Sequence, residues 1–210
     1  MSSEKFDVTY LSVDSIQEGV GSSQITPLIL GLAENGKKVC LITFEKIKPP
    51  KELSEKFSRA GVVWIAKEFG KPGAIGGLVR LNALRRNVPN SLVLHGRSDI
   101  ATAAAILSGI DAPVLWDVRG LWSDQRLLIG TAGWNSLTAK AARALENLAA
   151  RKSSAVTTLS AAVVPILQQR HKKIPTIRDV IPTCVQTSKF LPTPMPQGEL
   201  TCLLSGTFNN

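Results

Sequence analysis

The stretch DSIQEGVGSSQ, residues 14–24, carries the first side chains and backbone groups that could do chemistry. Backbone N–H groups at the start of a helix attract anions, and glycine lets a phosphate approach them closely. Gly19 and Gly21 match the first two glycines of the dinucleotide-binding pattern GxGxxG, and Gln24 replaces the third. We expect Gly19, Gly21 and Ser22 to bind phosphate. The alternative is a flexible turn in which one of the two serines caps the following helix.

A second candidate is WDVRGLW, residues 116–122, where Asp117 and Arg119 lie two positions apart at the end of an apolar run. Side chains two positions apart in a strand lie on the same side. Arg119 carries a permanent charge and five donors suited to phosphate. Gly120 allows a sharp turn, and Trp122 could form the wall of a cavity. The alternative is a local Asp–Arg ion pair that only fixes the loop.

Two further side chains follow predicted strands. His95 could act as a general acid or base, although a lone histidine at a strand end is often packed and hydrogen-bonded. Ser160 could lie in a cleft, or it could cap the helix that begins there.

Two glutamates need a separate prediction. Glu45 follows the second strand, where an acid can bind the ribose of NAD, but it also belongs to a charged segment. Glu146 lies in the longest predicted helix, and we expect it on a solvated face.

The elements that must position these residues alternate regularly along the chain. Short apolar runs predict strands, and apolar residues at helical spacing predict helices. Gly36 stands where the first helix should stop, Pro27 must fall in its first turn, and Ser98 should cap the fourth helix. The predicted strands are 6–13, 37–44, 62–66, 91–96, 112–118, 154–159 and 176–182, and the predicted helices are 23–36, 50–61, 74–87, 98–109, 136–153 and 160–171.

Strict β-α alternation predicts an α/β fold: a doubly wound, mostly parallel Rossmann-like sheet with helices on both faces. Ligands of such sheets bind beyond the carboxyl ends of the strands, so the candidate residues should share one edge. We expect this domain to span residues 1–184. Residues 185–199 are rich in proline and predict an interdomain linker, and residues 200–210 predict the first strand of a second domain.

The composition limits the partners. A net charge of +9 suits an anionic partner, whereas 5% aromatic residues argue against the stacking surfaces of proteins that bind single-stranded nucleic acid. Three widely spaced cysteines and two histidines predict neither a disulfide framework nor a metal site. Because no signal peptide or membrane span is evident, we expect a cytoplasmic protein, with peripheral attachment to a membrane as an option.

Basic residues gather in two segments that should be neighbours in the fold. We interpret them as a surface for an anionic membrane or an acidic acceptor, with an ordinary soluble basic surface as the alternative. The residues are Lys46, Lys48, Lys51, Lys56 and Arg59 in the first segment, and Arg80, Arg85 and Arg86 in the second.

Four stretches in this order resemble the N-terminal half of a retaining group-one glycosyltransferase with the GT-B architecture. They are GVGSSQ with LILGLAENGKKVCLITFE, then PVLWDVRGLWSD, then LENLAARKSSAVTTLSAAVVPIL, and finally VIPTCVQTSKF. The resemblance implies a nucleoside-diphosphate-sugar donor held mainly by a second domain and a saccharide or lipid-linked acceptor on this one. It implies no cofactor in this chain and no nucleic acid. The family has a histidine after the fifth strand, and in this sequence Arg119 stands at the matching position.

The resemblance implies that Gly19 and Gly21 face the donor phosphates, while the role of the family histidine does not carry over to Arg119. From the resemblance together with the chemistry of the residues, we expect three groups in the site. Arg119, Asp117 and His95 would be catalytic; Gly19, Gly21 and Ser22 would bind the donor; and Gly120, Trp122 and Ser160 would line the acceptor side of the cleft. Transfer would retain the anomeric configuration, and this domain alone would be inactive. The residues by themselves leave two alternatives: an NAD(P)-dependent oxidoreductase or epimerase domain, and a non-catalytic Rossmann-like binding module.

Overall fold

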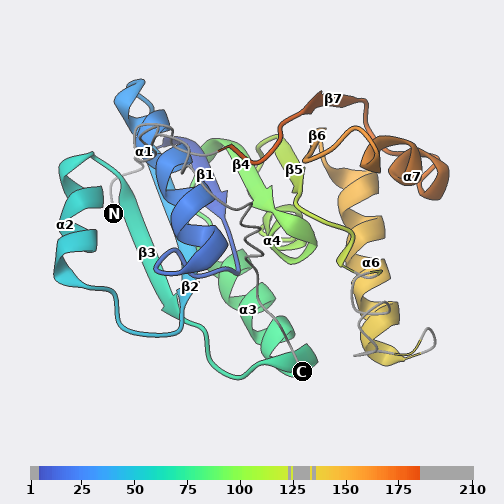
Figure 1. The fold of residues 1–210 in the computed structure, drawn as a ribbon, viewed down its shortest axis with the longest axis horizontal. Helices are drawn as coiled ribbons and strands as arrows, with labels where there is room; N and C mark the ends of the chain where they lie inside the picture. The colour runs from blue at the N-terminus through green and yellow to red at the C-terminus, as the bar shows by residue number, and fades with distance from the viewer. Residues whose placement is uncertain (1–4, 123, 125–132, 134–135, 185–210) are drawn as a thin grey trace, which may run out of the picture.

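A computed structural model describes residues 5–122, 124, 133 and 136–184 of the chain. Within this part, seven strands form one sheet in the order β3-β2-β1-β4-β5-β6-β7, and every neighbouring pair is parallel (Figure 1). The predicted doubly wound fold is therefore confirmed. The strands are β1 Phe6–Leu11, β2 Val39–Glu45, β3 Val63–Glu68, β4 Ser91–Arg97, β5 Val114–Val118, β6 Ala155–Thr158 and β7 Ile177–Val180.

Helices connect the strands and cover both faces of the sheet (Figure 1). On one face, Ile29 and Phe57 pack against Tyr10 and Leu41 of the sheet. A separate core gathers helical Leu84 with strand residues such as Leu94. The helices are the π-helical turn η1 Gly21–Ile25, α1 Thr26–Glu34, α2 Lys51–Arg59, α3 Gly73–Asn87, α4 Ser98–Ile106, α6 Leu137–Lys152 and α7 Val163–Arg170.

Local signals set several of these boundaries. β2 is buried at every position, as expected for an inner strand of a parallel sheet covered on both faces. Pro27 lies in the first turn of α1, where its missing N–H is tolerated. Gly36 adopts a φ of +73° just beyond the end of α1. Both predictions about this helix are confirmed.

Two predicted caps are wrong. Ser98 has a φ of +65° and is the first residue of α4, whose N-cap position is Arg97 and lacks a side-chain cap. Ser22 and Ser23 donate their hydroxyls to the carbonyl oxygen of Gly19 instead of accepting from a helix N–H. The segment forms the wider π-helical turn η1, in which the N–H of Thr26 donates to the carbonyl of Gly21, five residues earlier.

The strand order reverses direction between β1 and β4, because β2 and β3 extend the sheet on one side and β5 to β7 on the other. Such a switch point opens a crevice at the carboxyl edge, where ligands of this architecture bind. The predicted linker, 185–199, and the predicted first strand of a second domain, 200–210, lie outside the described residues. None of the described helices combines the length and the apolarity needed to cross a bilayer.

Candidate functional site

Six polar side chains meet at the carboxyl edge around the switch point, and we call them the cleft cluster: Asp14, Gln24, His95, Arg97, Asp117 and Arg119. Asp14 follows β1, Arg97 ends β4, and Arg119 follows β5 directly. Gln24 and Arg119 are 95 positions apart in sequence, and Asp14 lies further still from Arg119, so only the sheet topology brings these residues together.

Two guanidinium groups converge on one amide oxygen in the cleft cluster. Nη2 of Arg97 donates to Oε1 of Gln24 over 3.0 Å, and Nη2 of Arg119 donates to the same oxygen. Nε of Arg97 also donates to Oδ2 of Asp14 over 3.1 Å. Burial works to lower the pKa of Arg97, but the nearby Tyr10 and Asp14 outweigh it and raise that pKa. Two permanent positive charges are thus held side by side at the switch point.

The predicted catalytic residues Asp117, Arg119 and His95 also lie together. Nε2 of His95 is 3.4 Å from Oδ2 of Asp117, and Nη1 of Arg119 is 3.6 Å from Oδ1. Nε2 of His95 and Nε of Arg119 are buried and have no hydrogen-bond partner within the described part of the chain. The imidazole ring of His95 packs against the ring of Tyr10 at 4.4 Å, and burial raises the pKa of Tyr10 to about 12. One nitrogen of His95 and one of Arg119 thus remain without a hydrogen-bond partner beneath the crevice.

The glycine loop is shaped by close backbone contact. A Cβ atom on Gly21 would lie 1.7 Å from the carbonyl oxygen of Ser15, so no larger residue fits without a shift. Gly19 adopts a φ of +51° in the left-handed region. The N–H of Ser22 donates to the carbonyl of Glu18 over 3.3 Å, and its hydroxyl donates to the carbonyl of Gly19 over 2.9 Å. Both polar groups of Ser22 therefore have partners inside the loop.

Glu45 organises the segment in front of this loop and is not part of a merely charged surface. Its carboxylate is buried and accepts from the hydroxyl of Ser15 over 2.6 Å, the N–H of Ile16 and the amide of Gln17. The hydroxyl of Thr43 donates to it as well. Because these donors occupy the carboxylate, the NAD alternative loses the acid that it needed for the ribose.

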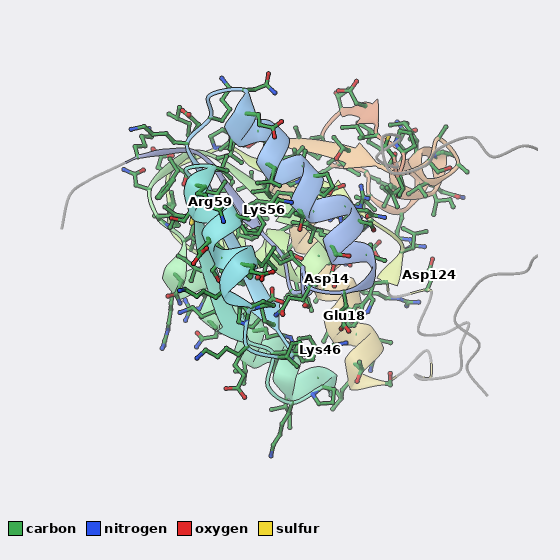
Figure 2. All side chains as sticks on the ribbon, turned by 60° about the vertical axis from the view of Figure 1, so that its left-hand side comes forward. Asp14, Glu18, Lys46, Lys56, Arg59 and Asp124 are labelled. Carbon is green, nitrogen blue, oxygen red and sulfur yellow. The ribbon has the colours of Figure 1, made fainter. Side chains whose placement is uncertain are left out.

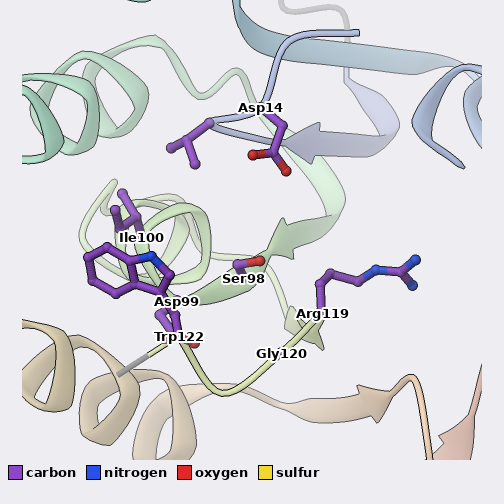
Figure 3. Close-up of a pocket in the computed structure, with 8 residues that line it drawn as sticks. Asp14, Ser98, Asp99, Ile100, Arg119, Gly120 and Trp122 are labelled. Carbon is purple, nitrogen blue, oxygen red and sulfur yellow. The ribbon is translucent and has the colours of Figure 1, made fainter. Parts of the chain in front are cut away.

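A cavity of about 140 Å³ opens beside the cleft cluster (Figure 3). Asp14 lies on one side of it, and Arg119, Gly120 and Trp122 lie on the other. The floor includes Ser98 and the first turn of α4. A larger hollow of about 610 Å³ lies along η1 and α1 and also reaches Arg119 and Thr183. Arg119 therefore borders both spaces.

Sequence reasoning did not identify Asp99, whose side chain is almost fully buried in the lining of the smaller cavity. Oδ1 accepts from Nε1 of Trp116 over 3.2 Å, while Oδ2 has no hydrogen-bond partner among the described residues. Burial, together with the negative charge of Glu146, raises the pKa of this carboxyl from 3.8 to about 7.

Arg97 was missed for a simple reason. The predicted strand 91–96 stops one residue early, so the rule that selects residues at carboxyl ends does not reach it. Asp14 stood in the first candidate stretch, but its role depends on contact with Arg97, 83 positions away.

Ser160 stays apart from the cleft cluster. Its hydroxyl accepts from the N–H of Ala162 over 3.2 Å at the beginning of α7, and it lines neither of the two cavities. This is a contact within the turn before α7, whose N-cap position is Ala162 and lacks a side-chain cap, so the prediction that Ser160 caps this helix is wrong.

Glu146 does not lie on a solvated face, and that prediction is wrong. The side chain is 2% exposed and accepts from Nη1 of Arg170 over 3.0 Å and 3.3 Å. It also lies 2.8 Å from Nε2 of His171. Arg170 pairs in addition with Asp124 over 2.6 Å. We call these four residues the buried cluster; it joins α6 to α7, which the helical pattern alone could not reveal.

No protein-family model and no curated protein matches this chain. Solved structures do match its fold. Apo UGT2 from Phytolacca americana superposes with a TM-score of 0.51 at 10% identity, covering 87% of this chain and 53% of that one. A UGT transferase from Siraitia grosvenorii in complex with UDP gives a TM-score of 0.49 at 10% identity, covering 82% and 50%. The chain spans about half the length of these structures, and the likeness shows a shared fold.

Proposed function

We propose that this chain is the acceptor-side domain of a glycosyltransferase that moves a sugar from a nucleoside-diphosphate-sugar to an acceptor hydroxyl with retention. The observation that carries the proposal is the pair of guanidiniums, Arg97 and Arg119, that meet at Gln24 beside a cavity at the switch point. The shared fold with apo UGT2 supports it, since UGT denotes a UDP-glycosyltransferase.

In the proposed reaction, the bond between the anomeric carbon and the diphosphate oxygen breaks, and a bond to the acceptor oxygen forms on the same face. The acceptor proton passes to the departing phosphate. Arg119 and Arg97 stabilise the negative charge that grows on the diphosphate, since fixed positive groups act strongly in a partly dry crevice. His95 and Asp117 orient the acceptor hydroxyl, using the capacity that their long contact leaves open.

The loop residues Gly19, Gly21 and Ser22 face the donor phosphates in this proposal. Gly120 and Trp122 form the acceptor wall, with Ser160 further along the same edge. A second domain after Asn210 supplies most donor contacts, which agrees with the half-length match to the solved structures. The acceptor is a saccharide or a lipid-linked sugar, and the protein acts at the cytoplasmic side of a membrane.

The first test measures UDP binding to the 210-residue chain by chemical-shift changes in backbone amide spectra. We expect weak binding that perturbs η1, Asp14 and the residues around Arg119. Arg119→Gln should weaken it about 10-fold or more, because a charge-assisted hydrogen bond is lost. Arg151→Gln, at the exposed end of α6, is the matched control and should have no effect. Equal binding by the two variants would contradict the proposal.

The second test uses the chain extended by its natural downstream sequence. We expect released UDP or GDP from one of a panel of sugar nucleotides when an acceptor sugar is present, and a loss of at least about 100-fold in Arg119→Gln. Turnover by the 210-residue chain alone, or a stop codon directly after Asn210, would overturn the assignment to one half of a two-domain enzyme.

A further inference from the structure

Helix α3 presents three large aliphatic side chains to solvent. Ile75 is 79% exposed, Leu78 is 63% exposed and Val79 is 62% exposed. Their spacing of i, i+3 and i+4 places them on one face of the helix, and we call them the α3 stripe. The other side of α3 packs on the protein, where Leu84 is fully buried near Ala101 of α4. Contiguous exposed aliphatic groups of this kind mark an interaction surface.

All charged residues of helix α3 are positive. The helix sequence GAIGGLVRLNALRRN contains three arginines and no acidic residue. Lys71 is exposed just before the helix, and Arg86 is exposed near its end. Arg86 follows Ile75 by eleven positions, about three helical turns, so the two lie on the same face. The stripe therefore has a cation at each end.

Arg80 fixes this surface and does not belong to it, which corrects the prediction that it lies in a basic patch. Its guanidinium is buried, and burial lowers its pKa. Nη1 donates to the carbonyls of Phe69 and Lys71 over 2.9 Å and 3.0 Å, and the guanidinium stacks 4.1 Å above the ring of Phe69. A Cβ on Gly76 would lie 1.8 Å from the carbonyl oxygen of Lys71, so loop and helix fit closely.

The first predicted basic segment, residues 46–59, differs from α3 because acidic side chains lie among its cations. Lys51 and Arg59 of α2 both pair with Glu55, and Lys46 pairs with Glu18 (Figure 2). Acidic neighbours thus reduce the positive potential over α2 and the β2–α2 loop. Helix α3 and the loop before it, residues 69–87, combine cations with exposed aliphatic groups and contain no acidic residue; the nearest one in sequence is Glu68, at the end of β3.

We propose that α3 docks on an anionic bilayer, with Ile75, Leu78 and Val79 inserted at the boundary between headgroups and acyl chains. Lys71 and Arg86 then lie at the level of the lipid phosphates. Apolar side chains flanked by cations are the pattern that lies in a membrane interface, and charge complementarity favours anionic lipid. α3 starts at the carboxyl edge, the edge that holds the cleft cluster. If the proposed function holds, this orientation brings a lipid-linked acceptor toward that edge.

The test is co-sedimentation of the 210-residue chain with phosphatidylcholine vesicles, with and without phosphatidylglycerol. We expect binding to the anionic vesicles only. The triple variant Ile75→Ser, Leu78→Ser, Val79→Ser should lower partitioning at least about 10-fold. The double variant Lys71→Glu, Arg86→Glu should lower it at least about 25-fold, since each cation contributes about 5-fold and each glutamate adds repulsion from the anionic lipid.

Matched controls carry the same changes elsewhere. Leu107→Ser alters an exposed aliphatic residue after α4, and Lys172→Glu alters an exposed cation after α7; both should bind like the original chain. Thermal unfolding of each variant shows whether it is folded. Equal binding to neutral and anionic vesicles would overturn the proposal, as would full binding by the folded triple variant, which is the result expected if another protein domain covers the α3 stripe.

The proposed function and the proposed membrane docking can be tested independently of each other. Arg119→Gln should lose UDP binding and keep vesicle binding, whereas the triple variant should keep UDP binding and lose vesicle binding. A loss of both properties in one folded variant would contradict the independence of the two surfaces.

Discussion

The cleft cluster and the buried cluster contain the same three kinds of side chain, a carboxylate, an arginine and a histidine, arranged for different tasks. In the buried cluster, Glu146 is within 3.0 Å of both Arg170 and His171. In the cleft cluster, Asp117 is 3.4 Å from His95 and 3.6 Å from an Arg119 nitrogen. The contacts of Glu146 are hydrogen bonds, whereas the contacts of Asp117 with His95 and Arg119 have ion-pair distances only; the hydrogen bonds of the cleft cluster go to Gln24 and Asp14 instead.

The two clusters differ in how many hydrogen-bonding groups are left without a partner. Glu146 accepts from two neighbouring residues and fastens α7 to α6, so its charge is compensated inside the fold. His95 and Arg119 each keep a buried nitrogen without a hydrogen-bond partner among the described residues. An unsatisfied buried polar group is costly, and both nitrogens are enclosed by the protein, so a ligand reaches them only after a neighbouring side chain moves. Similar residue types thus form a closed structural contact in one place and, under the proposed function, part of a binding site in the other.

The largest effect on stability is expected from a substitution that breaks the buried cluster. Glu146→Gln replaces the acceptor between Arg170 and His171 with a neutral amide and should lower the free energy of unfolding by about 3 kcal/mol. Urea denaturation measures it. The matched change Asp117→Asn should cost about 1 kcal/mol or less, because its partners are already distant. Equal destabilisation by the two variants would remove the distinction between the clusters.

A second prediction concerns Asp99, which lines the cleft cavity and senses the charge of Glu146. Its pKa is raised from 3.8 to about 7, so between these values the folded chain binds a proton that the unfolded chain has released. Stability should therefore fall as the pH rises through this window, by on the order of a few kcal/mol. Asp99→Asn should abolish this part of the pH dependence in urea denaturation. A variant that keeps the whole slope would show that another group causes it.

The smallest expected change in stability tests whether the backbone beside the cleft cavity is strained. Ser98 has a φ of +65°, a conformation that costs little for glycine. Ser98→Gly should raise the free energy of unfolding by about 0.5–1 kcal/mol. Ser54→Gly, inside helix α2, is the control and should lower it by a similar amount because glycine weakens helices. Destabilisation by Ser98→Gly would mean that another contact of the serine outweighs the strain.

The sequence predicted the layout better than the contacts. Alternating apolar runs and helical periods depend on burial alone, so the strand that holds Cys40 and Leu41 and the helix that ends before Gly36 could be placed. The local motif WDVRGLW likewise put Asp117 and Arg119 at one strand end. The pairing of Arg97 with Asp14 depends on two strands that are adjacent only in the folded sheet.

Three of the errors, unlike those about the serine caps, have one physical cause. Glu45, Arg80 and Glu146 are charged, and charged residues are usually exposed, so each was assigned to a surface. In the structure each is buried because neighbouring donors or carbonyl oxygens satisfy its side chain. Such compensation comes from distant segments and leaves no period or spacing in the sequence.

Gln24 stands at the third glycine position of the dinucleotide pattern and accepts hydrogen bonds from both Arg97 and Arg119. A neutral amide thus keeps two positive groups together. Under the proposed function, an anion that binds there displaces this tethered side chain. The released glutamine would regain rotamer freedom, which would offset part of the entropy that the ligand loses. Gln24 would then act as a weak, covalently attached competitor, and changing the length of that one side chain would adjust the affinity without altering either arginine.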